Sequence, residues 1–175
     1  WAKQSLWERA TRVPFIISAP GMSAGSPCTS PTELLSIYPT LAELCGLPQP
    51  DGLEGVSLVP LLQDPAAAWH HPAITTYGEG RFSVRSGPWR YIRYPDGEEE
   101  LYDHRSDPHE LSNLSSETEH AERKRLFRGL IPTRWEPSLG GREGEWWSDK
   151  VSVEGLRRGH GDLRQHPPAG GGDGH

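Results

Sequence analysis

Two pairs of histidines are the first candidates for chemistry in this sequence, because a neutral imidazole can bind a metal ion and transfer protons. His70 and His71 are adjacent, and neighbouring side chains on a helix or strand point in different directions. His104 and His109 flank the dipeptide Asp107-Pro108. We interpret all four as loop residues and not as a metal site.

Two cysteines and a short charged run are the other candidates. Cys28 and Cys45 are too few for a disulfide framework, and they are either small apolar thiols or the two halves of a single bridge. Glu8, Arg9 and Arg12 are interpreted as a salt-bridged loop that positions the apolar segment after it.

Composition limits the classes of function. The chain has 175 residues and a formal net charge of −6, which argues against a general nucleic-acid binder. It holds no run of 18 apolar residues, so we expect no membrane contact. The sequence fits a soluble protein that is either cytoplasmic or exported.

The first half of the chain predicts a strand and a helix that would position these residues. Residues 13–18 form a continuous apolar run, typical of a strand buried on both faces. Residues 30–33 resemble a helix start, and the apolar positions that follow lie on one helical face up to Gly46. Because Pro39 interrupts this pattern, we place the start of the continuous helix near Ser36 and expect Leu34-Leu35 to be extended. A short apolar turn follows at residues 58–62.

The second half changes to a period of two. Residues 82–85, 89–94 and 100–103 alternate apolar with polar side chains and predict a three-stranded meander. We expect the aromatic residues of 89–94 to pack across strands and residues 98–100 to form a solvated turn. Residues 116–130 predict an amphipathic helix. It would pack on the sheet through Ala121, Leu126, Phe127 and Leu130.

Residues 131–175 have a different composition. They hold ten of the 20 glycines and show almost no apolar periodicity, so we expect a disordered tail. Trp135, Trp146 and Trp147 are unusual in such a segment, since large apolar side chains are normally buried.

Three blocks together resemble the C-terminal portion of the sulfatase family, within the alkaline-phosphatase-like superfamily. The first block, residues 1–15, contains Lys3, an aromatic-acidic pair and Arg12-Val13-Pro14. The second, residues 33–46, contains Pro39-Thr40-Leu41. The third runs from Arg90 to Leu114 and ends in an Asp-Pro-x-Glu-x-x-Asn-Leu turn. The branch that these blocks resemble most is the iduronate-2-sulfatase-like one.

The resemblance implies an α/β fold in which the chain is the C-terminal fragment of an alkaline-phosphatase-like sulfatase. Residues 1–74 would be the end of the large mixed-sheet domain. Residues 75–130 would be a small antiparallel-sheet subdomain with its C-terminal helix, and residues 131–175 a Gly/Pro-rich tail.

The resemblance also implies cofactors. Sulfatases use a formylglycine made from Cys or Ser in a Cys/Ser-x-Pro/Ala-x-Arg motif, and a divalent cation, usually calcium, held by acidic residues with an Asp-His or Asp-Asn pair. This sequence contains neither motif, because Cys28 is followed by Thr29-Ser30-Pro31. We therefore expect both groups to come from a preceding, N-terminal part of the same protein.

One catalytic residue is implied within this chain. Lys3 matches the family lysine that contacts the substrate sulfate and the leaving oxygen, and a compact ammonium with three donors suits that role. The loop that contains Trp69, His70, Tyr77, Gly78 and Glu79 can approach the substrate cleft in this family. We take His70, Tyr77 and Glu79 as candidate substrate-binding residues.

The expected function is that of the C-terminal part of a sulfuric-ester hydrolase whose substrate is a sulfated small molecule or saccharide. The chain alone should be inactive. One alternative is a noncatalytic gene remnant or accessory module, which the glycine-rich tail favours. Another is a phosphate or phosphonate monoester hydrolase of the same superfamily, because an ammonium group stabilises either oxyanion.

Overall fold

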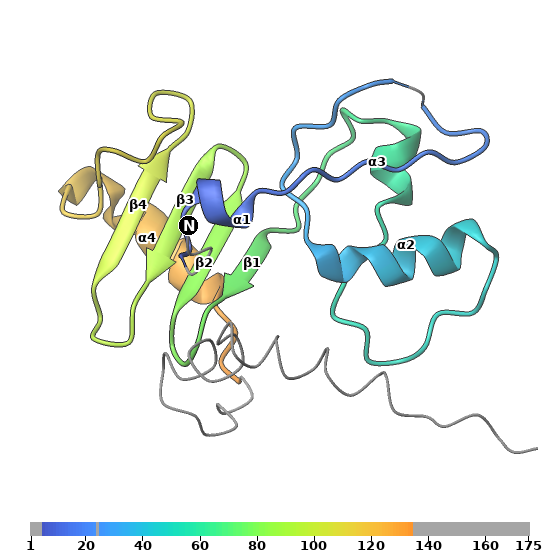
Figure 1. Cartoon of the computed structure of the whole chain (residues 1–175). Coiled ribbons are helices and arrows are strands. Elements are labelled where there is room, and N and C mark those ends of the chain that lie inside the picture. Colours follow the sequence, from blue (N-terminus) through green and yellow to red (C-terminus); the bar gives the residue numbers. More distant parts are fainter. Residues whose placement is uncertain (1–4, 24, 135–175) are drawn as a thin grey trace, which may run out of the picture. The chain divides into compact units, whose positions relative to one another are not determined.

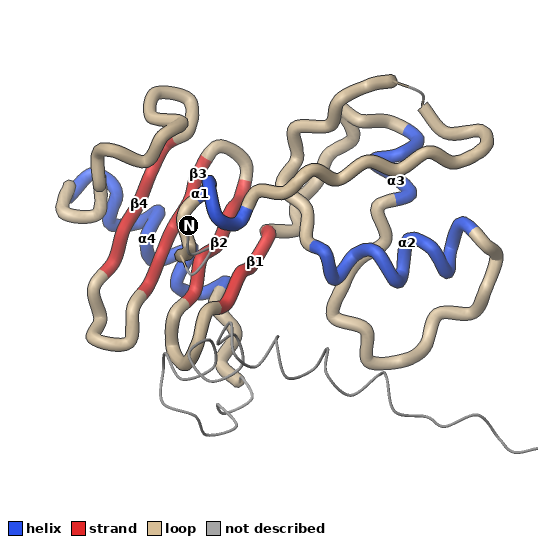
Figure 2. The backbone as a smooth tube through the Cα atoms, in the orientation of Figure 1, coloured by secondary structure: helices blue, strands red, loops and turns tan. Residues whose placement is uncertain are grey.

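The computed structural model describes residues 5–23 and 25–134 and contains a four-stranded antiparallel sheet (Figures 1 and 2). The strands pair in chain order: β1 (Ala73–Thr76), β2 (Phe82–Ser86), β3 (Trp89–Arg93) and β4 (Glu99–Asp103). Val84 lies opposite Tyr91, which lies opposite Leu101. The predicted meander is confirmed as β2 to β4. The first strand was not predicted.

Six helical segments complete the described residues. They are the α-helices α1 (Glu8–Thr11), α2 (Ile37–Leu44), α3 (Val59–Gln63) and α4 (Ala121–Leu130), and the 3-10 turns η1 (Leu34–Ser36) and η2 (Thr118–His120). None of the helices in the described part of the chain is long and apolar enough to cross a membrane.

The strand predicted over residues 13–18 is not formed. Its backbone is irregular, and the side chain of Ile16 is 90% exposed. An apolar run becomes a strand only where another strand offers its backbone groups. In the described residues every strand pairing lies within β1 to β4, so this run has no partner.

Helix α2 begins at Ile37, close to the predicted start, and tolerates Pro39 in its first turn. Two expectations beside it were wrong. Leu34 and Leu35 form a 3-10 turn, and the predicted cap at residues 30–33 makes no capping contact with that turn. Instead, a carboxylate oxygen of Glu33 accepts the Ile74 N–H at the start of β1.

The Pro-Thr-Leu motif joins α2 to α3. Thr40 is fully buried; its hydroxyl donates to the Ser36 carbonyl and accepts the Leu58 N–H at 2.9 Å. Cys28 and Cys45 are both exposed and unbonded, which excludes a bridge between them in this structure.

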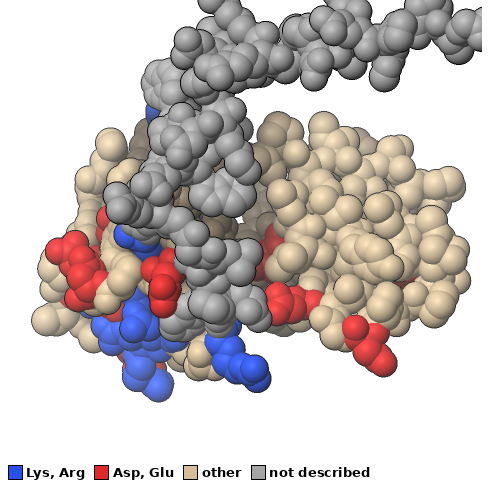
Figure 3. Space-filling view, turned by 60° about the horizontal axis from the view of Figure 1, so that its bottom comes forward, with Lys and Arg blue, Asp and Glu red and all other residues tan. Residues whose placement is uncertain are grey.

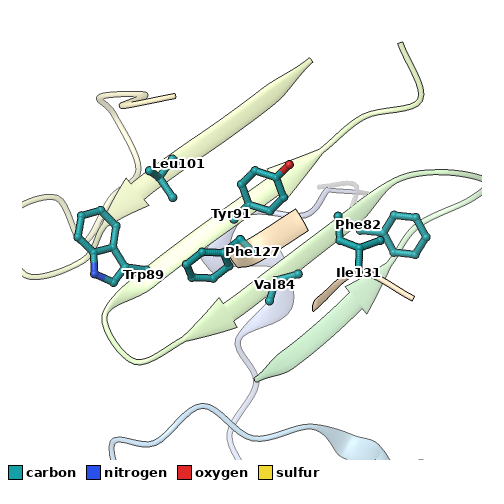
Figure 4. Packing of buried hydrophobic residues seen from close by; sticks show 7 residues of the cluster. All are labelled: Phe82, Val84, Trp89, Tyr91, Leu101, Phe127 and Ile131. Atoms are coloured by element: carbon teal, nitrogen blue, oxygen red, sulfur yellow. The ribbon is translucent and has the colours of Figure 1, made fainter. Parts of the chain in front are cut away.

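Helix α4 covers one face of the sheet and closes the main core. Figure 4 shows this core, which consists of Phe82, Val84, Trp89, Tyr91, Leu101, Phe127 and Ile131. The expected cross-strand packing of the aromatic residues on β3 is confirmed on this face. Ile131 is buried here, directly after the end of α4.

The apolar face predicted for α4 was wrong except at Phe127, because Leu126 and Leu130 are exposed. The positions that face the sheet carry basic residues. Arg123 lies 3.8 Å from the centre of the Trp89 ring, and Lys124 and Arg128 bind Glu99. Long basic side chains cover apolar surface with their methylene stems while their charged ends find partners.

Glu99 anchors α4 to the sheet, so the prediction of a solvated turn at residues 98–100 was wrong for this residue. Its carboxylate accepts hydrogen bonds from Arg128, at 2.6 Å from Nη2, from Lys124 at 3.2 Å and from the Tyr91 hydroxyl at 2.5 Å. The Arg128 hydrogen bonds lower the pKa of Glu99 to about 2, against the opposing effect of burial. Burial and the neighbouring Glu99 raise the pKa of Tyr91.

We expect Glu99→Gln to destabilise the chain by about 1–2 kcal/mol near pH 7. This is less than the pKa shift alone would give, because water reaches the half-exposed Arg128. A depressed carboxyl pKa stabilises the fold above the ordinary pKa of 4.5, and this contribution is lost as the pH falls towards about 2. Denaturant unfolding between pH 7 and pH 2 should therefore show the two proteins converging in acid. A constant difference over this range would contradict the assignment.

Candidate functional site

Residues 5–12 lie against the second face of the sheet, opposite α4 (Figure 1). Leu6 is buried there against Ile92 and Tyr102. The indole N–H of Trp7 donates to the Glu100 carboxylate at 2.7 Å, and the hydroxyls of Tyr94 and Tyr102 donate to the same group. Glu100, like Glu99, is therefore not part of a solvated turn.

Burial and the nearby Glu100 carboxylate raise the pKa of Tyr94 to about 12, and they raise that of Tyr102 as well. Both phenols therefore stay protonated at neutral pH. They act as hydrogen-bond donors to Glu100 and not as bases.

Arg90 is the centre of the contacts on this face. Its side chain is only 3% exposed. One nitrogen, Nη1, donates to the Leu6 carbonyl at 3.1 Å and to the Ser83 hydroxyl at 2.6 Å. The guanidinium also pairs with the carboxylates of Glu8 and Glu110, with Nε 2.6 Å from a Glu110 oxygen.

Glu110 reaches Arg90 from the loop after β4. The residue has a φ of 57°, which L-amino acids rarely adopt. The Asp107 carboxylate holds this turn by accepting the N–H groups of Leu111 and Ser112, each at 2.8 Å. The Glu110 carboxylate accepts the Glu8 N–H at 2.8 Å and contacts His104 Nε2, also at 2.8 Å.

Asn113, in the same loop, covers the edge strand β4. Its side-chain oxygen accepts the Leu101 N–H at 3.0 Å and its amide donates to the Glu99 carbonyl. The Asp-Pro-x-Glu-x-x-Asn-Leu motif thus has a local explanation. Asp107 holds the turn, Glu110 pairs with Arg90, and Asn113 hydrogen-bonds backbone groups that an unpaired edge strand would expose.

We call Glu8, Arg85, Arg90, His104 and Glu110 the Arg90 cluster. Burial alone would raise the pKa of Glu8, but its hydrogen bond to Arg90 and the charges of Arg90 and Arg85 outweigh burial and lower it. Burial lowers the pKa of the Arg85 guanidinium, which lies 3.7 Å from Glu8. Both carboxylates accept hydrogen bonds from the protein itself, so the cluster serves to hold segments together.

A metal ion does not fit the cluster. Ligand atoms of Glu8, His104 and Glu110 lie within 4.8 Å of one another, but the Arg90 guanidinium already pairs with both carboxylates. A second group, Glu117, Glu119 and His120, has exposed carboxylates. Neither group is the set of aspartates with Asp-His or Asp-Asn that the resemblance implies for calcium, so calcium fits neither of these groups in the described part of the chain.

A pocket of about 420 Å³ opens at the end of the sheet where β2 turns into β3 and where β4 ends. Arg85 and His104 of the cluster line it, together with Arg105, Trp69 and His71. Residues 29–31 also line it.

Of the predicted site residues the structure describes His70, Tyr77 and Glu79, and it places His70 at one end of β1 and the other two at its opposite end. Lys3 lies outside the described residues. His70 is exposed in the loop before β1, next to two residues that line the pocket. Tyr77 and Glu79 are exposed in the turn after β1, at the opposite end of that strand. Their role in substrate binding stays a prediction.

Sequence reasoning identified Glu8 as one partner of a salt bridge but missed Arg90, His104 and Glu110. No signal in the sequence marked Arg90 for burial. It alternates with Trp89 and Tyr91 and therefore falls on the polar face of a half-buried strand, where an arginine is ordinary.

Comparisons with known proteins find relatives for the described part of the chain. Residues 1–132 match the family described as "N-sulphoglucosamine sulphohydrolase, C-terminal". A sulfatase of Formosa agariphila is 39% identical over 132 residues, covering 75% of this chain and 26% of that protein. Arylsulfatase K of Rattus norvegicus is 35% identical over 130 residues, covering 66% and 23%.

Among solved structures, a phosphonate monoester hydrolase from Silicibacter pomeroyi aligns with a TM-score of 0.61 at 24% identity. The alignment covers 74% of this chain and 30% of that one, and it shows a shared fold. The chain spans about a quarter of the length of the two relatives above.

Proposed function

The chain belongs to the sulfatases, in the family of their C-terminal domains, and from this premise we propose that the protein it forms part of hydrolyses a sulfate monoester. The substrate that we propose is a sulfated saccharide. The name of the matching family supports it, because that name specifies a sulphated amino sugar.

One observation carries this proposal. The Arg90 cluster is built from the same blocks that carry the family resemblance, with Glu8 from the first block and Arg90 and Glu110 from the third. These contacts fix residues 6–8 on the sheet, and Lys3 is three residues before Leu6. The sheet would thereby serve as the support for the segment that carries the proposed catalytic lysine.

In the proposed reaction, Lys3 donates hydrogen bonds to the oxygens of the transferred sulfate group. Its positive charge stabilises the negative charge that grows on the leaving oxygen as the S–O bond breaks. A formylglycine hydrate and a calcium ion, held by another part of the protein, would provide the nucleophile and the main countercharge. The Arg90 cluster acts only by positioning.

We also propose the iduronate-2-sulfatase-like branch for this chain. The support is the first block, in which Trp1-Ala2-Lys3 precedes the aromatic-acidic pair Trp7-Glu8. The curated relatives carry the coarser name sulfatase or the name arylsulfatase K. Activity on a 2-sulfated uronic acid disaccharide, against a 6-sulfated hexosamine, would decide the branch.

The proposal is tested by reading the coding DNA before Trp1 and assaying the whole protein. We expect an open frame with the Cys/Ser-x-Pro/Ala-x-Arg motif, and release of sulfate by the complete protein in the presence of calcium. The 175-residue chain alone should release none, because it lacks the nucleophile motif and the metal ligands. Unrelated DNA before Trp1, or a complete protein that cleaves phosphonate esters and no sulfate ester, would overturn the proposal.

A further inference from the structure

The wall of the pocket beside the Arg90 cluster has an unusual charge pattern. Two arginines and two histidines line it, namely Arg85, Arg105, His71 and His104. None of the described residues that line it is acidic. A surface of this kind presents positive charge and hydrogen-bond donors to whatever enters.

The carboxylates that balance these side chains lie behind the wall. Arg85 lies 3.7 Å from Glu8, His104 contacts Glu110, and Arg105 forms a two-pronged contact with Asp103, at 2.9 Å from Nε. These acids hold the basic groups in place without lining the cavity themselves. The side chain of Arg105 is 64% exposed, more than those of Arg85 and His104.

The pocket also offers a surface suited to a sugar ring. The rings of Trp69 and His71 are 4.8 Å apart, and the Trp69 indole is fixed by a hydrogen bond from Nε1 to the Pro31 carbonyl at 3.1 Å. Thr29 and Ser30, which also line the pocket, carry hydroxyl groups. An indole held in one orientation can pack on the apolar face of a sugar while hydroxyl groups bind its polar edge.

We propose that this pocket binds a sugar unit bearing a sulfate or carboxylate group, with Arg85 and Arg105 on the anionic group and Trp69 against the ring. The inference rests on the proposed function only for the choice of a sugar as ligand. The volume of about 420 Å³ lies in the range of small-molecule sites. Because Arg85 and His104 also belong to the Arg90 cluster, a ligand here contacts the residues that fix the segment after Lys3.

The test uses the chain as it stands and the indole N–H signal of Trp69 in NMR spectra. The signal is assigned from a Trp69→Phe variant, and Trp7, whose indole donates to Glu100 and does not line the pocket, serves as an internal reference. The probes are glucose 6-sulfate, glucuronate, glucose and inorganic sulfate at constant ionic strength. We expect saturable shifts with a Kd on the order of millimolar for at least one charged sugar, and weaker binding of glucose and of sulfate.

Two variants distinguish binding at this pocket from non-specific electrostatic attraction between the ligand and the protein. Arg105→Ala should weaken binding by at least about five-fold, as the loss of a charged hydrogen-bond donor implies. Arg93→Ala, which removes the same charge from the other end of β3, should leave binding unchanged. Arg85→Gln should also weaken ligand binding. Because Arg85 contacts Glu8, this variant is compared only when its NMR spectrum matches that of the native chain.

Several results would overturn the proposal. These are a Trp69 signal that does not saturate, equal binding of glucose and glucose 6-sulfate, equal binding of inorganic sulfate and the charged sugars, or equal effects of Arg105→Ala and Arg93→Ala. Binding is measured without turnover, so its failure is distinct from failure of the proposed sulfatase activity. Comparison of the two charged sugars identifies which anionic group the pocket prefers.

Discussion

Replacing Arg90 by methionine is expected to lower the free energy of unfolding by about 3–5 kcal/mol. Methionine fills much of the same volume, but it leaves the carboxylate of Glu110, with a side chain 3% exposed, without its arginine. It also removes the nearest cation from Glu8, which keeps only Arg85 at 3.7 Å and Arg12 at 3.8 Å. The carbonyl of Leu6 and the hydroxyl of Ser83 lose a donor as well. A loss of this size is a large fraction of the stability of a small domain.

The matched control is Arg93→Met, an exposed arginine on the same strand, which should change stability by less than about 0.5 kcal/mol. Urea unfolding read by pulse proteolysis suits both variants, because it works at low protein concentration. The double variant Arg90→Met/Glu110→Gln should recover part of the loss, since it also removes a buried charge. If the effects of Arg90→Met and Glu110→Gln on stability simply add, the contact between Arg90 and Glu110 does not stabilise the fold.

Lys3→Ala is expected to reduce kcat of the complete enzyme by about 10²–10³-fold with little change in stability. The expectation rests on the proposed function, in which the ammonium stabilises the leaving oxygen. The reduction should therefore be larger for a sugar sulfate, whose leaving group is a basic alkoxide, than for a nitrophenyl sulfate, whose leaving group is already stable. Steady-state kinetics on both substrates measure this difference.

Arg9→Ala is the control, because Arg9 is an exposed residue of α1 in the same segment and carries the same charge. It should leave kcat unchanged. An equal reduction on both substrates would show that Lys3 does not act at the leaving oxygen. An unchanged kcat would remove Lys3 from the reaction.

The sequence predicted those parts of the fold that depend on local pattern. The alternation of apolar and polar residues over 82–103 correctly predicted three strands. In a half-buried strand successive side chains point to the core and to the solvent, so the pattern is visible in the sequence. The first strand, Ala73–Thr76, was not predicted, because Ala-Ile-Thr-Thr has only one large apolar side chain in four residues. The strand predicted over residues 13–18 was wrong for the opposite reason. The run is strongly apolar, but an apolar run does not indicate whether a partner strand is present.

The candidate site was the least predictable part. Arg90 and Glu110 are 20 positions apart, and each has an ordinary surface interpretation when it is read alone. Only the antiparallel pairing of β3 and β4, followed by the turn with Glu110 at a φ of 57°, places them together. The orientation of α4 was missed similarly, because Lys124 and Arg128 pack towards the sheet through Glu99.

Residues 6–8 are far in sequence from the residues that hold them on the sheet, and this affects the order in which the chain folds. The four strands follow one another through short turns and can pair as soon as they leave the ribosome. Leu6 and Glu8 form their contacts later, because their partners Arg90 and Glu110 are synthesised 84 and 102 residues after them. Residues 6–8 are thus synthesised before the sheet that holds them and are secured only after that sheet has formed.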